Sequence, residues 1–431
     1  MSYQLQIYQY PGSKSNILDT EENVIFGNHV LKPSLNLGFI HFLHRTKDKM
    51  EILYSDKFKG KYFYLVTNEF EHMIENYKKD LNTIALKSLN VNKMIISRAF
   101  FKLWEILKIF NVANEKDGMN ILHLAEAPGS FVQATLYYRD KYSKKSNKDK
   151  HYVISINDKS KGVPSLHKLS KSLTKDHSKR VTVHGYTSSD NGDLTNEKVL
   201  FNLQKKMKDR ADLITADGGF NWTNENFQEQ EAIRLILAEI IGAVMNQKEG
   251  GHFILKIFET FTETSIKLIE ILNCFYSNIF IYKPYTSRSS NSEKYLICEK
   301  FKKISEDKRK EYIMKLLDVL KKINLQETMN GLFVHNIFTN YKLSVNIRNF
   351  FQILNSKFMI NQMKQINKII TYIKSENYFG DEYHQFKNEQ IEATKYWEEI
   401  FLKNKSISEL IIKQIKKNKS EINSHHNSYI N

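Results

Sequence analysis

The feature that most restricts how this chain can fold is a series of short apolar runs, each with a charged residue at one end. Asp217 and Lys256 lie where two such runs end, and Glu293 lies where a third begins. Ligands of open α/β sheets bind outside the carboxyl ends of the parallel strands. If the third strand runs antiparallel to the others, its start lies at that same edge. The pattern therefore predicts that the three side chains meet in one cleft.

Strand and helix patterns alternate across the middle of the chain, which is typical of a doubly wound parallel sheet. An apolar stripe at helical spacing covers residues 97–110, and it is interrupted by Lys102. Strands are predicted at residues 120–125, 152–156, 180–184, 211–216, 253–258, 279–282 and 295–298. We therefore expect an α/β fold with a Rossmann-like sheet.

Four parts are expected along the chain. Residues 1–90 form an N-terminal accessory region with a strand at 61–66, and residues 91–302 form the α/β domain. Residues 303–419 show helical periodicity with lysine on the polar face, and residues 420–431 have the composition of a disordered tail. The first part is a candidate for contact with RNA or with a protein partner, and a protein partner could also bind the third part.

Composition limits the class of protein and its partners. The chain has 431 residues, of which 41% are hydrophobic, and a net charge of +16. Such a charge favours polyanions, above all nucleic acid, although solubility and a lysine-rich composition would also account for it. Two cysteines cannot form a disulfide framework or a zinc site by themselves, and no metal is expected. Without an apolar run of membrane length or a signal-peptide pattern, we expect a soluble intracellular protein that does not bind membranes, in cytoplasm or nucleus, or in host cytoplasm or virion if it is viral.

A strand that leads through a tight turn into a helix is a common cradle for an adenosine cofactor. Here the turn consists of Ala125, Glu126, Ala127, Pro128, Gly129, Ser130 and Phe131. Glycine lets the backbone approach a ligand closely, and N–H groups at a helix start point toward it. The turn is shorter than the dinucleotide fingerprint, and the chain has no phosphate-binding P-loop, which argues against NAD and ATP. A purely structural turn of this kind is commoner than a cofactor loop.

Two aspartates follow neighbouring strands and are candidates to bind the adenosine part of a cofactor. Asp193 lies within the segment 191–195, and its carboxylate can accept a hydrogen bond from an adenine amino group or a ribose hydroxyl. Asp158 is a weaker candidate for the ribose. The plainer interpretation of Asn191-Gly192-Asp193 is a turn.

Lys256 stands inside an apolar run, where a charge is costly unless it is paired or used. A buried ion pair with Asp217 would explain it. Alternatively, Lys256 lies beside a substrate hydroxyl and helps to remove its proton, either through a lowered pKa or as a positive charge. In that case Asp217 orients Lys256, while Glu293 and Lys102 hold the substrate ribose.

Taken together, these motifs resemble the FtsJ-like ribose 2′-O-methyltransferases, and within them most closely the mRNA cap enzymes, including those of large DNA viruses. The resemblance covers about residues 94–302. The matching segments are 97–103 with Lys102, 124–131 at the turn, 192–195 with Asp193, 216–220 with Asp217, 255–258 with Lys256 and 287–295 with Glu293. Two departures are Ser130, where the family usually has a second glycine, and His123, where many members carry an acidic residue.

The resemblance implies a catalytic Lys102–Asp217–Lys256–Glu293 tetrad, S-adenosylmethionine as methyl donor and the capped 5′ end of mRNA as substrate. Near the tetrad, the candidates to stack on or bind the RNA are Phe220, Trp222, Lys283, Tyr285 and Arg288. Two other functions stay open. The acceptor could be ribosomal or transfer RNA, or the chain could be a non-catalytic RNA-binding subunit with a methyltransferase-like fold.

Overall fold

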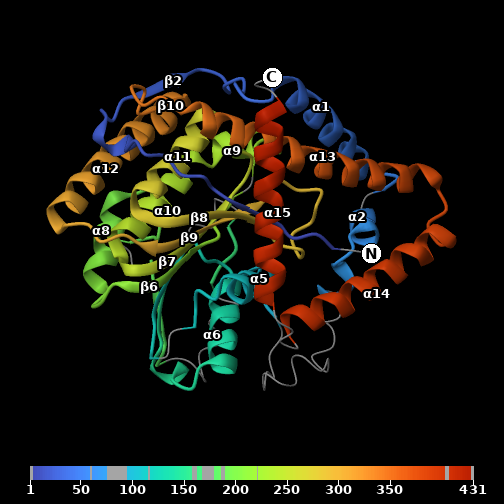
Figure 1. Cartoon of the computed structure of the whole chain (residues 1–431), viewed down its shortest axis with the longest axis horizontal. Helices are drawn as coiled ribbons and strands as arrows, with labels where there is room; N and C mark the ends of the chain where they lie inside the picture. The colour runs from blue at the N-terminus through green and yellow to red at the C-terminus, as the bar shows by residue number, and fades with distance from the viewer. Residues whose placement is uncertain are drawn as a thin grey trace.

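A twisted central sheet runs through the molecule, with helices on both of its faces (Figure 1). In this computed structural model, the described residues are 3–58, 61–74, 95–114, 117–157, 163–166, 179–185, 190–220, 222–402 and 407–428. The α/β class predicted from the alternating patterns is confirmed.

Within the described residues the central sheet has eight strands in the order β1-β8-β9-β7-β6-β3-β4-β5. The strands are β1 (Gln6–Gln9), β3 (Asn120–Leu124), β4 (Lys150–Ile154), β5 (Val181–His184), β6 (Ala211–Ala216), β7 (Gln247–Ile257), β8 (Tyr276–Lys283) and β9 (Lys294–Phe301). Strands β7, β6, β3, β4 and β5 run parallel to one another. Strand β9 lies antiparallel between β7 and β8, as the position of Glu293 required.

This topology brings the charged strand ends to one edge of the sheet. Asp217 directly follows β6, and Lys256 is the penultimate residue of β7. Because β9 is antiparallel, Lys256 pairs with Tyr295 near the start of β9, and Glu293 immediately precedes that strand.

Helices cover the sheet in two layers. In the described residues they are α1 (Leu37–Asp48), α2 (Phe63–Thr67), α5 (Ala99–Phe110), α6 (Ser130–Tyr142), α8 (Glu197–Lys206), α9 (Gln228–Glu231), α10 (Ile233–Asn246), α11 (Glu263–Phe275), α12 (Glu306–Asn330), α13 (Val345–Ser375), α14 (Asp381–Phe401) and α15 (Ile407–Ser428), with short 3₁₀ turns at Ile17–Asp19, Lys49–Tyr54 and Ser146–Lys148. One core cluster joins α5, α6 and α14 to one face, and another joins α8, α10, α11, α12 and α13 to the other.

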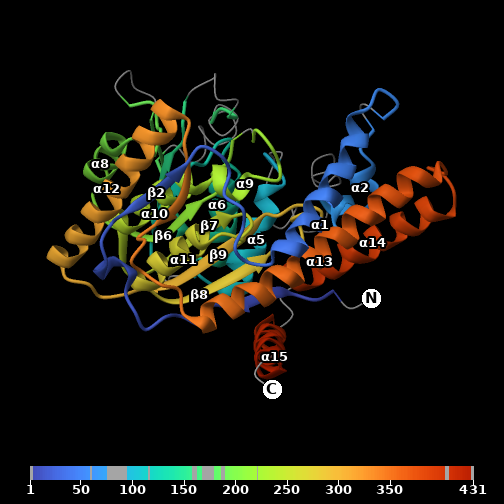
Figure 2. The ribbon, with the colours of Figure 1, turned by 90° about the horizontal axis from the view of Figure 1, so that it is seen from above.

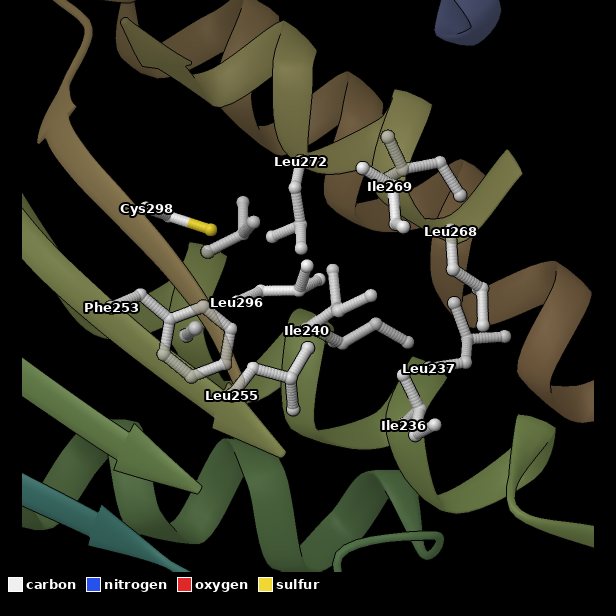
Figure 3. Close-up of a cluster of buried hydrophobic side chains, with 14 of the residues drawn as sticks. Ile236, Leu237, Ile240, Phe253, Leu255, Leu268, Ile269, Leu272, Leu296 and Cys298 are labelled. Carbon is white, nitrogen blue, oxygen red and sulfur yellow. The ribbon is translucent and has the colours of Figure 1, made fainter. Parts of the chain in front are cut away.

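The core cluster that joins α10 and α11 to the sheet shows how the apolar residues of the strands pack (Figure 3). Phe253 and Leu255 of β7 and Leu296 of β9 point toward Ile240 of α10 and Leu272 of α11. All five side chains are at most 1% exposed. Burying such side chains contributes roughly 1.5–3 kcal/mol each, so this layer holds the strand ends rigidly in place.

The first 90 residues do not all lie in one place. Strand β1 pairs antiparallel with β8 and so belongs to the central sheet. The strand predicted at residues 61–66 is wrong, because helix α2 occupies Phe63–Thr67. Phe63 and Thr67 are one turn apart and both buried, and Phe63 belongs to a core cluster with Ile366 and Phe386 of the C-terminal helices, so tertiary packing decides the local conformation.

The C-terminal region is helical except for strand β10 (Phe333–Ile337), which pairs with β2 (Val24–Gly27). Helices α13 and α14 extend away from the sheet beside α1 and α2 (Figure 2). Helix α15 crosses β1 and continues to Ser428, into the stretch for which the sequence predicts disorder. Asn418 donates to the carbonyl of Ile7 at 2.6 Å, and Ile422 packs on the core, which gives this polar helix its support.

Within the residues that the structure describes, we find no helix with both the length and the apolar character needed to span a bilayer.

Candidate active site

Two lysine–carboxylate pairs meet at the carboxyl edge of the sheet. Nζ of Lys102, on α5, lies 2.7 Å from Oε1 of Glu293. Nζ of Lys256 lies 3.3 Å from Oδ1 of Asp217 and donates to the main-chain carbonyl of the same residue at 2.9 Å. The structure thus brings together all four residues of the predicted tetrad. Their side chains are 9–18% exposed, so they are largely buried but still accessible from solvent.

Tyr295 connects the two pairs. Its hydroxyl donates to Oδ1 of Asp217 at 2.9 Å and lies 3.4 Å from Oε1 of Glu293. Burial, together with the two carboxylates, raises the pKa of Tyr295 well above its ordinary value, so the hydroxyl stays a donor. The sequence did contain a signal for this residue, because Tyr295 follows Glu293 by two positions and strand residues two apart share a face.

The charges of the four residues support one another. Burial favours the neutral amine of Lys256, but neighbouring carboxylates, Asp217 and Glu293 first among them, outweigh burial and raise its pKa above the ordinary value. Burial likewise opposes ionisation of Glu293, yet Lys102 and Lys256 lower its pKa to about 2. Lys256 is therefore a cation in the free protein. This favours the role in which it acts on the substrate hydroxyl as a positive charge over the role that needs a lowered pKa.

A cleft of about 940 Å³ opens beside the tetrad, along the carboxyl ends of β3, β4, β6 and β7. Its size is within the range of small-molecule and cofactor sites, about 300–1,000 Å³. Asp217, Lys256 and Glu293 line it, whereas Lys102 lies behind Glu293. The other lining residues include Ala125, Ala127, Ser155, Gly192, Asp193, Leu194, Phe220, Trp222, Arg234 and Phe258.

The turn after β3 contributes to the cleft in part. Ala125 and Ala127 line it, and the N–H of Ala127 donates to Oγ of Ser155 at 3.1 Å. Gly129 has a φ of 107°, in the region that favours glycine, where it starts α6. The cleft lining does not include Pro128, Gly129, Ser130 or Phe131.

Glu126 lies beneath the turn, and it too is absent from the cleft lining. It is 3% exposed, and its Oε1 accepts hydrogen bonds from the N–H groups of Phe131 and Val132 at 2.7 and 3.1 Å. These are two of the N–H groups that a helix start leaves without a partner, so Glu126 caps α6. Ser130 is also buried, and its hydroxyl lies 2.7 Å from that of Ser97, which ties α6 to the start of α5.

Asp193 reaches the cleft through a turn that needs glycine. A Cβ added to Gly192, which has a φ of 74°, would lie 2.1 Å from the carbonyl oxygen of Ser155. The carboxylate of Asp193 accepts from the N–H and hydroxyl of Thr195 at 3.0 and 2.7 Å. Asp158, the other candidate for the adenosine, lies outside the described residues.

Glu239, on α10, is a site residue that the sequence reasoning missed. It is 1% exposed, and its Oε1 accepts from the N–H of Gly218 at 3.1 Å, directly behind Asp217. Burial raises the pKa of Glu239 to about 8, so it is mostly protonated at neutral pH. The available signal was a single acidic residue within the apolar stretch that spans residues 233–245.

The five residues considered for RNA contact lie in different places. Phe220 and Trp222 line the cleft with ring centroids 4.4 Å apart. Lys283 is buried and donates to the main-chain carbonyls of Asn291 and Glu293, both at 2.9 Å, so it fixes the loop that carries Glu293.

Like Lys283, Tyr285 and Arg288 are absent from the cleft lining. The ring of Tyr285 stacks on Phe70 at 5.1 Å, and its hydroxyl donates to the carbonyl of Tyr3. Arg288 pairs with Glu71 at 3.2 Å.

His123 is also remote from the cleft lining, although it is close to the turn in sequence. It is fully buried in β3, where its ring bonds with Thr215 and His151 at 2.8 and 3.1 Å. Burial lowers the pKa of His123 to about 3, so it is a neutral member of the core.

Comparisons with known proteins point to one family. Residues 95–301 match the family model described as FtsJ-like methyltransferase. A mouse protein named cap-specific mRNA (nucleoside-2′-O-)-methyltransferase 2 is 30% identical over 57% of this chain and 32% of its own length. The Drosophila melanogaster protein of that name is 30% identical over 48% of this chain and 30% of its own length. An uncharacterized protein of Acanthamoeba polyphaga mimivirus is 27% identical over 62% of this chain and 33% of its own length. The chain therefore spans about a third of the length of these relatives.

Proposed function

Since residues 95–301 are an FtsJ-like methyltransferase domain, we propose that this chain is an S-adenosylmethionine-dependent RNA ribose 2′-O-methyltransferase acting on the capped 5′ end of mRNA. The observation that carries the proposal is the pair of lysine–carboxylate contacts, joined by Tyr295, at the side of a cofactor-sized cleft. An RNA-binding module without catalysis has no need for two nearly buried lysines that meet at one point.

The cleft fits S-adenosylmethionine. Ala125 and Ala127 at the strand–helix turn would approach the cofactor with their backbone, and Gly192 lets the chain pass close to the carbonyl of Ser155 so that Asp193 reaches the cleft. Asp193 would bind the adenosine part. Asp217 and Lys256 line the same cleft as Asp193, so a cofactor bound there would lie beside the tetrad. When bound, S-adenosylmethionine supplies a methyl group already activated by a positively charged sulfur.

The tetrad residues then orient and polarise the ribose. Nζ of Lys256 would donate a hydrogen bond to the 2′-oxygen, and its positive charge would stabilise the negative charge that develops as this oxygen bonds to the methyl carbon. The methyl–sulfur bond would break with its electrons on sulfur, S-adenosylhomocysteine would leave, and the hydroxyl proton would pass to solvent in the cleft. Asp217 holds Lys256 through both its carboxylate and its carbonyl. Glu293 would accept a hydrogen bond from the neighbouring sugar hydroxyl, Lys102 holds that carboxylate from behind, and Tyr295 keeps the two pairs in register. Holding the reactants in line supplies much of such a rate enhancement.

The capped end of mRNA is proposed as the acceptor for two reasons. Relatives from mouse and Drosophila carry the name of cap-specific enzymes, and the match covers the segment with all four tetrad residues. In addition, Phe220 and Trp222 present two rings in the cleft beside Lys256, where a base of an RNA end can stack. The net charge of +16 suits an RNA substrate as well.

A methyl-transfer assay with labelled donor tests the proposal. Short RNAs with a cap, with an uncapped triphosphate end and with a ribosomal or transfer RNA sequence are compared as acceptors. We expect label on a 2′-oxygen near the cap and much less on the uncapped RNAs. Equal labelling of uncapped RNA would shift the acceptor to another RNA class, and calorimetry that detects no S-adenosylmethionine binding would refute the enzymatic function.

A further inference from the structure

A second cluster of charged side chains lies beside the Lys102–Glu293 pair, and the proposed reaction makes no use of it. Arg98 donates to the carboxylate of Glu71 from both terminal nitrogens, at 3.3 and 2.8 Å. Arg288 donates to the same carboxylate from Nε and from one terminal nitrogen, at 3.4 and 3.2 Å. Glu71 is 4% exposed. Two guanidinium groups therefore share one buried carboxylate.

The cluster is carried by the same two segments as Lys102 and Glu293. Arg98 is one helical turn before Lys102 at the start of α5, and residues four apart lie on the same side of a helix. Arg288 precedes Glu293 by five positions in the loop between β8 and β9. The cluster and the lysine–carboxylate pair therefore lie side by side.

Both segments are held firmly. The start of α5 is tied to α6, because the N–H of Ile96 donates to Oε1 of Gln133 at 2.9 Å. The loop is tied to Glu105, which accepts from the N–H groups of Tyr285 and Thr286 at 2.8 and 2.9 Å. Arg98 and Arg288 are consequently preorganised relative to the tetrad, as a substrate-binding cluster must be.

The charges of the cluster do not balance. One carboxylate neutralises one guanidinium, and a contact that only joined the N-terminal segment to α5 would need Arg98 alone. Arg288 is 30% exposed at its side chain and lies over the ring of Tyr64, with 4.6 Å between its guanidinium carbon and the ring centre. Nε of Arg98 is buried and has no hydrogen-bond partner among the described residues. The cluster thus carries a positive charge near Lys102 that no carboxylate within the cluster balances.

We propose that Arg288 binds a phosphate of the RNA backbone next to the ribose at the Lys102–Glu293 pair, while Arg98 holds Glu71 beside it and adds to the positive charge. The terminal nitrogen of Arg288 that does not bind Glu71 can donate to a phosphodiester oxygen, and the negative charge of the phosphodiester would balance the cluster. Such a contact positions the strand without reading its bases. The inference rests on the proposed function, because it takes RNA as the substrate of the same site.

Equilibrium binding of a short fluorescent capped RNA, measured by anisotropy with S-adenosylhomocysteine present, tests the contact. Arg288→Gln leaves Arg98 and Glu71 as a balanced pair, so the fold should be unaffected. We expect about tenfold weaker binding, the effect of one lost hydrogen bond to a charged group. The slope of log affinity against log salt should fall by about 0.7. Arg210→Gln is the matched control, because it removes the same charge from a solvent-exposed pair with Glu306. Equal affinities of the two variants would overturn the proposal.

A second measurement locates the phosphate. Capped RNAs are made with a single neutral methylphosphonate at each of the first linkages in turn. At one linkage the wild-type protein should lose about tenfold in affinity, while Arg288→Gln loses nothing further. Equal losses in both proteins at every linkage would overturn the contact. A wild-type protein that binds RNA in this way but transfers no methyl group would instead refute the proposed function and leave the phosphate contact standing.

Discussion

Two clusters of buried charge lie at opposite ends of the central sheet, and they are built differently. At the amino ends of β3 and β4, Arg139 and Asp149 are both buried and form two hydrogen bonds of 2.8 and 2.9 Å. Further donors of Arg139 reach the carbonyls of Ala113 and Asp117, and the N–H of Met119 donates to Asp149. This cluster is closed, because its charges balance and solvent does not reach them.

At the carboxyl ends of the strands the charges around Lys256 are open. The side chains of Lys256 and Asp217 are 12% and 18% exposed and face the cleft. Lysines and carboxylates alternate there, and Tyr295 and Glu239 hold them in place without covering them. The comparison teaches that burial of a charge is not itself a sign of function. A closed cluster stabilises the fold, whereas an open one can still bind a substrate.

The sharpest test of the open cluster is Lys256→Ala. We expect methyl transfer to fall by about 10³-fold, because the charge that stabilises the developing oxygen anion is lost. S-adenosylmethionine affinity by calorimetry should stay within about twofold. Lys248→Ala is the control, since Lys248 is an exposed lysine of the same strand that pairs with Asp212 at 2.6 Å. Wild-type turnover in Lys256→Ala would make the open cluster as structural as the closed one.

For the closed cluster, Arg139→Met should act on stability instead. It leaves Asp149 buried without its partner, which costs about 3–5 kcal/mol in the free energy of unfolding. Urea denaturation measures the loss, with Arg210→Met as the control, whose exposed pair contributes less than about 1 kcal/mol.

Methyl transfer per folded Arg139→Met molecule should be unchanged. If the variant is too unstable to purify, Arg139→Lys retains the charge and should show a smaller loss. Stability equal to that of Arg210→Met would contradict the structural role of the closed cluster.

Tyr295→Phe asks whether the connection between the two open pairs matters. Loss of the hydroxyl removes a hydrogen bond to a charged group, and we expect about tenfold slower methyl transfer. Tyr312, on α12, offers a comparable hydroxyl, which donates to Asp19 at 3.0 Å. Tyr312→Phe removes this hydroxyl and should leave the rate unchanged. If both variants have the wild-type rate, the two pairs act independently of Tyr295.

The prediction for Glu239 concerns the pH dependence of stability. The folded-state pKa of Glu239 is about 8 against 4.5 in an unfolded chain, so between these values only the folded protein keeps the proton. The free energy of unfolding should therefore fall as pH rises from 4.5 to 8, by at most about 1.4 kcal/mol per pH unit.

Glu239→Gln lacks this contribution, and its urea midpoints should decline less steeply over the same range. Glu249→Gln, at an exposed position of β7, should follow the wild type. Parallel pH profiles of wild type and Glu239→Gln would show that Glu239 is ionised in the folded protein.

Local pattern was sufficient for much of the fold and for the four central residues. Apolar runs predicted the strands, and the charged residues at their ends predicted which side chains gather at one edge, because the ends of adjacent strands share that edge. The FtsJ-like resemblance of the middle of the chain is likewise confirmed for residues 95–301.

Contacts between distant segments were not predictable in this way. Lys283 and Tyr285 looked like substrate residues, but Lys283 binds its own loop and Tyr285 packs against the N-terminal segment. The predicted strand at 61–66 is a helix because the C-terminal helices bury one of its faces.

The sequence by itself determined the alternating α/β framework and the residues that meet at its carboxyl edge, because periodicity and strand ends are local properties. Only the tertiary structure decided which buried charges are closed and which remain open. Lys256 stands within an apolar run, whereas Arg139 follows Leu136-Tyr-Tyr138 and precedes two further charged residues, and both side chains are nevertheless largely buried. Whether all the hydrogen-bonding groups of each side chain find partners depends on residues from other segments, and no local pattern encodes those residues.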